Sequence, residues 1–284
     1  MKKRSFFAVL VIATSFALLS TSCTNESNVA TDASLTTTAT DEAQAASLSD
    51  VVLSTADTYV NTLADNGYTL LMAVKAENQL TGPTITIDKP DSLYFPKTIT
   101  IDFGTTGFID SRGDTLKGKI IINISEKLWK SGAIKTIKPV DFYVNGNNVK
   151  GSKSIVNNGL NLAKNPSMTV SVSDTIVRVD KSTIIRNSTR TRERIDTNGT
   201  PHIFWDDKFS ITGSTAGVNA KGVAYTVEIT TPLIIYNNYP YFVQGTVTTT
   251  TQTRTAVLDY GDGTKDRKAT LTINGVAKDI FLRN

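Results

Sequence analysis

The feature that most constrains the fold is an alternation of apolar and polar residues that begins near Thr84 and recurs toward the C-terminal end of the chain. In segment 98–103 the apolar residues Ile99, Ile101 and Phe103 alternate with threonine and aspartate. The same period of two returns in segments 120–124, 140–144, 170–172, 225–229 and 269–273. Because successive side chains of a strand point to opposite faces, this pattern predicts antiparallel strands with one face on a core and the other in water.

Two Asn-Gly pairs, at 145–146 and 274–275, indicate tight turns because both residue types tolerate positive φ. The second pair predicts a hairpin between segments 269–273 and 276–280. Helices and strands do not alternate after residue 97, which argues against a doubly wound nucleotide-binding sheet. The predicted fold is therefore mostly β: a large antiparallel sheet or sandwich of about ten to twelve strands, with one or two N-terminal helices.

The first 22 residues have the pattern of a signal peptide. Met1-Lys2-Lys3-Arg4 is basic, and an apolar run of 14 residues, Phe6 to Leu19, follows it. This run is too short for the ~30 Å hydrocarbon core of a bilayer, which requires about 20 helical residues, but it suits the apolar part of a secretory signal. Removal of the peptide leaves 27 basic against 26 acidic residues. This balance gives no argument for a nucleic-acid partner.

The apolar run ends in Leu19-Ser20-Thr21-Ser22-Cys23, where small residues precede the only cysteine of the chain. This segment resembles the lipobox of bacterial lipoproteins in the looser form of the Bacteroidota, because the leucine lies four residues before the cysteine instead of three. The segment YGDGTKDRKATLTINGVAKDI also resembles the C-terminal end of uncharacterised β-rich lipoproteins of that group. The resemblance implies lipidation of Cys23, and Thr24 after it implies the outer membrane. An ordinary secretory signal with a stray cysteine is the alternative.

Three segments are expected after the signal peptide. Residues 23–46 contain no aromatic and almost no large apolar residue, so they are predicted to be a lipidated, flexible tether. Residues 47–83 are predicted to be a helical segment, because Val52, Tyr59 and Leu63 recur at roughly helical spacing, Ser49 or Asp50 could cap the start and Asn66-Gly67 would end the helix. Within this segment, residues 70–80 are either a second short helix or a strand. Residues 84–284 form the predicted β domain.

Four arginines lie at even positions of one predicted strand and therefore share one face: Arg186, Arg190, Arg192 and Arg194. Like charges along a strand repel each other unless acidic groups oppose them or an anion binds. This face is the candidate anion-binding site. The alternative is that the arginines pair with carboxylates on neighbouring strands.

Two further groups of residues are candidate sites. Asp259, Asp262 and Asp266 lie in a glycine-containing loop that could offer oxygen ligands to calcium, although the spacing is not that of an EF-hand and a plain turn is favoured. His202, the only histidine, lies near Asp206 and Asp207. No serine stands in a nucleophile elbow that would complete a catalytic triad with them.

The sequence thus predicts an outer-membrane lipoprotein with a non-enzymatic structural or binding role and without a cofactor. Expected partners are the membrane, through the lipid anchor, and a glycan or other anionic envelope component. The alternative is a carrier of a lipid or other apolar ligand, because a curved sheet capped by a helix can enclose a groove. A hydrolase would need carboxylates that converge in a pocket.

Overall fold

The computed structural model describes residues 26–68, 82–91, 93–196, 206–239, 241–252 and 254–282. Within these residues one long helix, α1 (Glu26–Asp65), precedes fourteen strands. The strands are β1 (Thr84–Ile87), β2 (Lys97–Asp102), β3 (Phe108–Ile109), β4 (Thr115–Ile124), β5 (Ile134–Val144), β6 (Asn147–Leu160), β7 (Pro166–Val177), β8 (Thr183–Asp196), β9 (Lys208–Val218), β10 (Ala224–Tyr236), β11 (Gln244–Thr251), β12 (Arg254–Asp262), β13 (Lys268–Ile273) and β14 (Val276–Phe281).

All described strands belong to one antiparallel sheet, in which strands adjacent in sequence are adjacent in space. The exception is the two-residue strand β3, which pairs only with β4 and lies off the main path. Strands β1 and β14 are the two edges of the sheet. The predicted mostly-β fold with a large antiparallel sheet is confirmed, and the sheet is open instead of folded into a sandwich.

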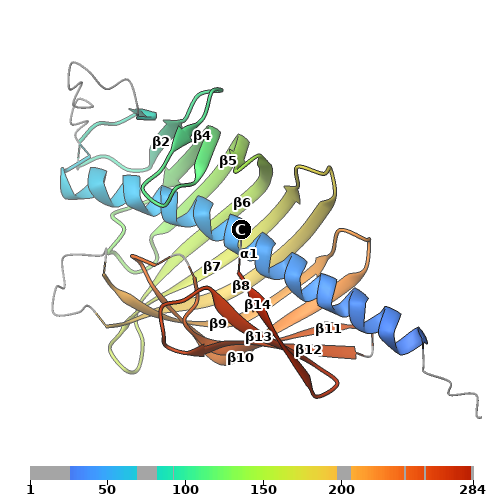
Figure 1. Cartoon of the computed structure of the whole chain (residues 1–284). Coiled ribbons are helices and arrows are strands. Elements are labelled where there is room, and N and C mark those ends of the chain that lie inside the picture. Colours follow the sequence, from blue (N-terminus) through green and yellow to red (C-terminus); the bar gives the residue numbers. More distant parts are fainter. Residues whose placement is uncertain are drawn as a thin grey trace, which may run out of the picture.

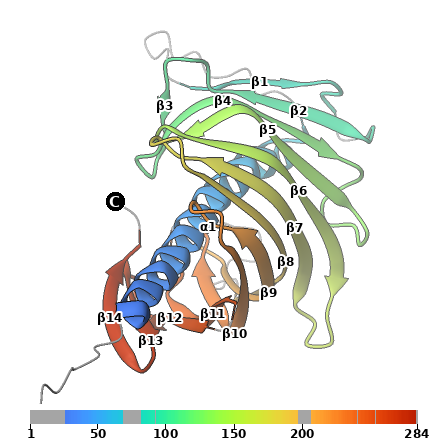
Figure 2. The ribbon, with the colours of Figure 1, turned by 90° about the vertical axis from the view of Figure 1, so that its right-hand side faces the viewer.

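The sheet curls, so that its strands arch around the helix (Figure 2). Two glycines lie where the strand register changes: Gly118 between β4 and β5, and Gly245 between β11 and β12. Their φ angles are +84° and +104°, and a Cβ atom would lie 1.9 Å from the Asp141 carbonyl oxygen and 2.3 Å from that of Pro232. Only glycine fits such bulges, and bulges bend a sheet.

Helix α1 runs along the concave face of the sheet (Figures 1 and 2). Its second half packs with the inward-facing residues of β2 to β8, where Val52, Val60, Ile99 and Ile122 are fully buried. Its first half contributes Leu35 and Ala39 to a second apolar cluster with β9 to β13. The helix is therefore the second layer of the fold and covers the apolar face of the sheet.

The predicted flexible tether over residues 23–46 is wrong for its described part, because α1 begins at Glu26. Leu35, Ala39, Ala45 and Ala46 are all buried against the sheet. Threonines of this segment, such as Thr38, satisfy their hydroxyls by donating to the carbonyl four residues earlier in the helix. Small, internally bonded side chains let the helix lie close to the strands without large apolar residues.

The helix ends as the sequence predicts. Gly67 has a φ of +63°, and its N–H donates to the Ala64 carbonyl at 3.0 Å. A left-handed residue at this position is a common way to end a helix. The predicted helical segment over residues 47–83 is thus confirmed up to Asp65, and residues 69–81 lie outside the described part.

Candidate functional site

The face of α1 that meets the sheet carries acidic residues among its apolar ones, and the strands beneath it carry basic residues. The helix contains seven Asp or Glu residues and neither Lys nor Arg. Opposite it, β5, β6 and β8 carry Lys135, Lys153 and Arg186, which are all buried. A buried charge is very costly unless it is paired, so each of these groups needs a partner.

A compact charge cluster lies at the middle of this interface. Arg186 donates to Glu42 of the helix at 3.0 Å, and its Nη1 lies 3.8 Å from Asp174. Lys153 donates to both oxygens of Asp174, at 2.7 and 2.8 Å, and Ser49 of the helix donates to the same carboxylate at 2.5 Å. Burial lowers the pKa of Lys153, and the Asp174 carboxylate opposes that effect. These groups hold the helix to the sheet.

Arg190 and Arg192 are paired less closely than Arg186. Their Nη1 atoms lie 4.0 Å from Asp50 and 3.8 Å from Asp57, respectively, and Asp57 also accepts a short hydrogen bond from Lys135. The Nε atoms of both arginines are buried and make no hydrogen bond. Burial lowers the pKa of Arg192, while the neighbouring carboxylates raise it. Two cationic groups thus keep unused donors inside the molecule.

Arg192 and Arg194 also contact residues that are not on the helix. An Nη2 atom of Arg192 donates to the Asn237 side-chain oxygen at 2.6 Å, and its guanidinium lies 3.7 Å from the centre of the Phe209 ring. Arg194 pairs with Asp207 at 2.7 Å. Burial raises the pKa of Asp207, and the hydrogen bond from Arg194 counteracts part of that effect.

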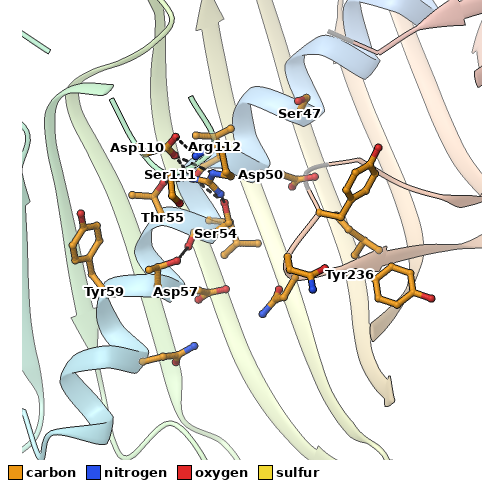
Figure 3. Close-up of a pocket in the computed structure, with 18 of the residues that line it drawn as sticks. Ser47, Asp50, Ser54, Thr55, Asp57, Tyr59, Asp110, Ser111, Arg112 and Tyr236 are labelled. Atoms are coloured by element: carbon orange, nitrogen blue, oxygen red, sulfur yellow. Dashed lines mark hydrogen bonds and ion pairs between the residues drawn. The ribbon is translucent and has the colours of Figure 1, made fainter. Parts of the chain in front are cut away.

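A cavity of about 600 Å³ lies between the second half of α1 and the concave face of the sheet. Arg112, in the loop after β3, closes one side by donating to Ser54 and to Thr55 of the helix, the latter at 2.9 Å, and pairs with Asp110 (Figure 3). The loop after β10 supplies the opposite side with Asn237 and other polar residues. This volume is within the range of small-molecule sites.

The lining of the cavity has an apolar part and a polar part. Its floor includes the aliphatic side chains Val170, Val172, Ile211 and Ile235. Charged and amide groups converge on it from three elements: Asp50 and Asp57 from α1, Arg190 and Arg192 from β8, and Asn237 and Asn238 from the loop after β10. An apolar floor with a few convergent polar groups is typical of a site for a small organic ligand.

The structure bears out one part of the arginine prediction and contradicts another. The four arginines do share one face of β8, but this face is the concave one under α1 and is not open to solvent. Arg186 and Arg194 bind carboxylates within 3.0 Å, so they are committed to the fold. Only Arg190 and Arg192 remain as candidates for anion binding.

The other candidate residues are placed as follows. Asp259, Asp262 and Asp266 each accept a hydrogen bond from a backbone N–H two residues further on, as in ordinary turns. In the described ranges no group of three or more His, Cys, Asp or Glu residues is arranged for a metal ion. His202 and Cys23 lie outside the described residues.

Sequence reasoning missed the acidic partners on the helix, chiefly Glu42, Asp50 and Asp57. A usable signal was present, because all charged residues of segment 26–65 are acidic while one strand carries four arginines on one face.

Among the described residues, the structure contains no helix with the length and hydrophobicity of a membrane span. No family model, curated protein or solved structure matches the chain.

Proposed function

We propose that this chain is an outer-membrane lipoprotein, anchored through Cys23, that binds a small ligand non-enzymatically in the cavity between α1 and the sheet. The observation that carries the binding role is the cavity of about 600 Å³, into which α1, β8 and the loop after β10 bring polar groups over an aliphatic floor. The signal-like N-terminus and the lipobox-like segment carry the anchoring role.

A binding role is favoured over hydrolysis by the state of the carboxylates in the cavity. Asp50, Asp57 and Asp110 each have an arginine or lysine nitrogen within 4.0 Å. Ion-paired carboxylates are suited to hold structure and charge. General acid catalysis needs a carboxyl group that is positioned to pass a proton to the substrate.

The second candidate function is the carriage of a lipid or other apolar ligand. The observation in its favour is the long apolar concave face, but the side chains of α1 cover that face. An apolar carrier would therefore have to release α1 when it loads, whereas a ligand in the cavity leaves the helix in place.

Amide hydrogen exchange of α1 separates the two roles. The lipidated protein is purified from membranes in nanodiscs, and bound small molecules are identified by native mass spectrometry. A cavity ligand slows exchange over residues 47–65, and an apolar cargo speeds exchange along the whole of α1. If removal of all co-purified small molecules leaves amide exchange unchanged throughout α1, both roles are contradicted.

Anchoring is tested by fractionation of cells that produce Cys23→Ala. We expect this variant to leave the membrane fraction and to lack the added mass of the acyl groups. Ser22→Ala keeps the cysteine and is the matched control. A Cys23→Ala protein that stays in the membrane fraction like the parent would contradict the anchor.

A further inference from the structure

We propose that the cavity takes a small monocarboxylate with an apolar body, whose carboxylate binds Arg190 and Arg192. This inference rests on the proposed binding function and names the chemical class of its ligand. It differs from the exposed arginine face expected from the sequence, because the site is internal and uses only two of the four arginines.

The first argument is the local balance of charge. Arg190 and Arg192 line the cavity together with Asp50 and Asp57, and Lys135, which is outside the lining, pairs with Asp57 as well. Three cationic groups thus share two carboxylates. The other buried charges are balanced: Arg112 pairs with Asp110, and Arg186 together with Lys153 balances Glu42 and Asp174. Asp65 is exposed at the end of the helix, where solvent screens it. The enclosed part of the site therefore lacks about one negative charge.

The second argument is the unused hydrogen-bonding capacity of the two arginines. Their ion pairs of 4.0 and 3.8 Å are longer than a charge-assisted hydrogen bond, and 12% of each side chain is exposed, although one Nη2 donor of Arg192 is already used by Asn237. The planar guanidinium group presents paired donors that match the two oxygens of a carboxylate. A ligand carboxylate would supply acceptors that the protein does not.

The third argument is the chemistry of the cavity around the place where the ligand carboxylate would bind. Val172, Ile211 and Ile235 line the same cavity and offer an apolar surface for the body of the ligand. At the opposite side, Lys265 lies 4.2 Å from the centre of the Tyr236 ring and donates to the Asn238 side chain at 3.2 Å. A cation near the tyrosine and asparagine that line the cavity favours the approach of anions.

Three probes with the same body test the assignment: 4-phenylbutyrate, 4-phenylbutanol and 4-phenylbutylamine. They are titrated calorimetrically into the full lipidated chain in nanodiscs, with empty nanodiscs as the blank. We expect the carboxylate to bind at least about tenfold more tightly than the alcohol and the amine to bind least well, since hydrogen bonds to charged groups are the stronger ones.

Variants at the arginines and at a competing carboxylate supply the residue-level test. Arg190→Gln and Arg192→Gln should each weaken 4-phenylbutyrate by roughly tenfold and leave the alcohol unaffected. Asp50→Asn should strengthen 4-phenylbutyrate, because it removes a competing negative charge. Asp50 tolerates substitution since its side chain is 36% exposed, so this variant keeps the test valid if an arginine variant does not fold. Lys150→Gln, at an exposed position of β6, is the matched control.

The outcomes distinguish this inference from the proposed function. Equal binding of the three probes leaves a ligand-binding cavity and overturns the carboxylate assignment. Carboxylate binding that is the same in Arg190→Gln, Asp50→Asn and the parent overturns the assignment of the residues. If none of the probes binds and none slows amide exchange over residues 47–65, both the inference and the binding function fail.

Discussion

Arg186 and Glu42 are a buried ion pair that joins residues 144 positions apart in the chain. The side chains are 1% and 6% exposed, and Glu42 also accepts a hydrogen bond from the Tyr225 hydroxyl at 2.6 Å. Burial works against the charge of Arg186, but Glu42 and then Asp174 raise its pKa above the ordinary value. Arg186 therefore remains cationic, and its hydrogen bonds to Glu42 link the middle of α1 to β8.

Removal of one partner of this pair should destabilise the fold strongly. We expect Arg186→Met to lower the free energy of unfolding by about 3–5 kcal/mol, because Glu42 would keep a buried charge that has lost its cation. Adding Glu42→Gln to that variant should recover part of the loss. Urea unfolding of the two variants and the parent gives the comparison. A double variant that is less stable than Arg186→Met would show that the buried carboxylate is not the cause.

The sequence predicts the local geometry of such residues but not their partners. The alternation of β8 correctly places Arg186, Arg190, Arg192 and Arg194 on one face, because the side-chain period of a strand is fixed by the backbone. Whether that face meets solvent or another element depends on contacts between distant parts of the chain. Three of the four arginines have a carboxylate of α1 within 4.0 Å.

At the scale of elements, the strands were predictable and the start of the helix was not. Ile99 and Ile101 alternate with polar residues and are buried as expected, and the hairpin around Asn274-Gly275 forms with the predicted strands. The first half of α1 has only one large apolar residue in its described part, Leu35, so its composition resembles that of a flexible linker. The surface that orders it comes from β9 to β13, far along the chain.

The first half of α1 should therefore contribute to stability. Deletion of residues 24–46 removes both Leu35 and Glu42 and is expected to lower the thermal midpoint by about 10 °C or more, because for a domain of this size each kcal/mol corresponds to roughly 2–4 °C. Leu35→Ala alone should cost about 2–5 kcal/mol, since Leu35 is 1% exposed. Thr40→Ala, at an exposed position of the same helix, is the control. An unchanged midpoint in the deletion variant would show that this half of the helix does not pack in solution.

At the scale of the whole molecule, one helix organises an open sheet. The two apolar clusters of the core lie on two halves of α1, and the buried charges of Asp174 and Arg186 lie beneath its middle, where Arg186 meets Glu42 of the helix. Because α1 takes part in both clusters, loss of the helix would expose the concave face from β2 to β13. We therefore expect the helix and the sheet to unfold as one cooperative unit.

Tyrosines buried in the fold also determine how its stability depends on pH under alkaline conditions. Burial raises the pKa of Tyr68 to about 12, from a value of 10.0, and burial also raises the pKa values of Tyr225 and Tyr260. Below pH 10 these tyrosines are protonated in both states, so their contribution to stability is fully present. Above pH 10 the unfolded chain loses their protons while the folded chain keeps them. The free energy of unfolding must then fall, by up to about 1.4 kcal/mol per pH unit for each tyrosine.

Urea unfolding at pH 9, 10 and 11 measures this slope. Tyr260→Phe should make the decline between pH 10 and 11 shallower, because phenylalanine has no proton to lose and fits the same buried site near Phe242. Tyr94→Phe is the matched control, since the Tyr94 side chain is 64% exposed. Parallel declines in the parent and in Tyr260→Phe would mean that ionisation of this tyrosine is not linked to unfolding. The difference between the two variants isolates the tyrosine from the lysines that titrate over the same range.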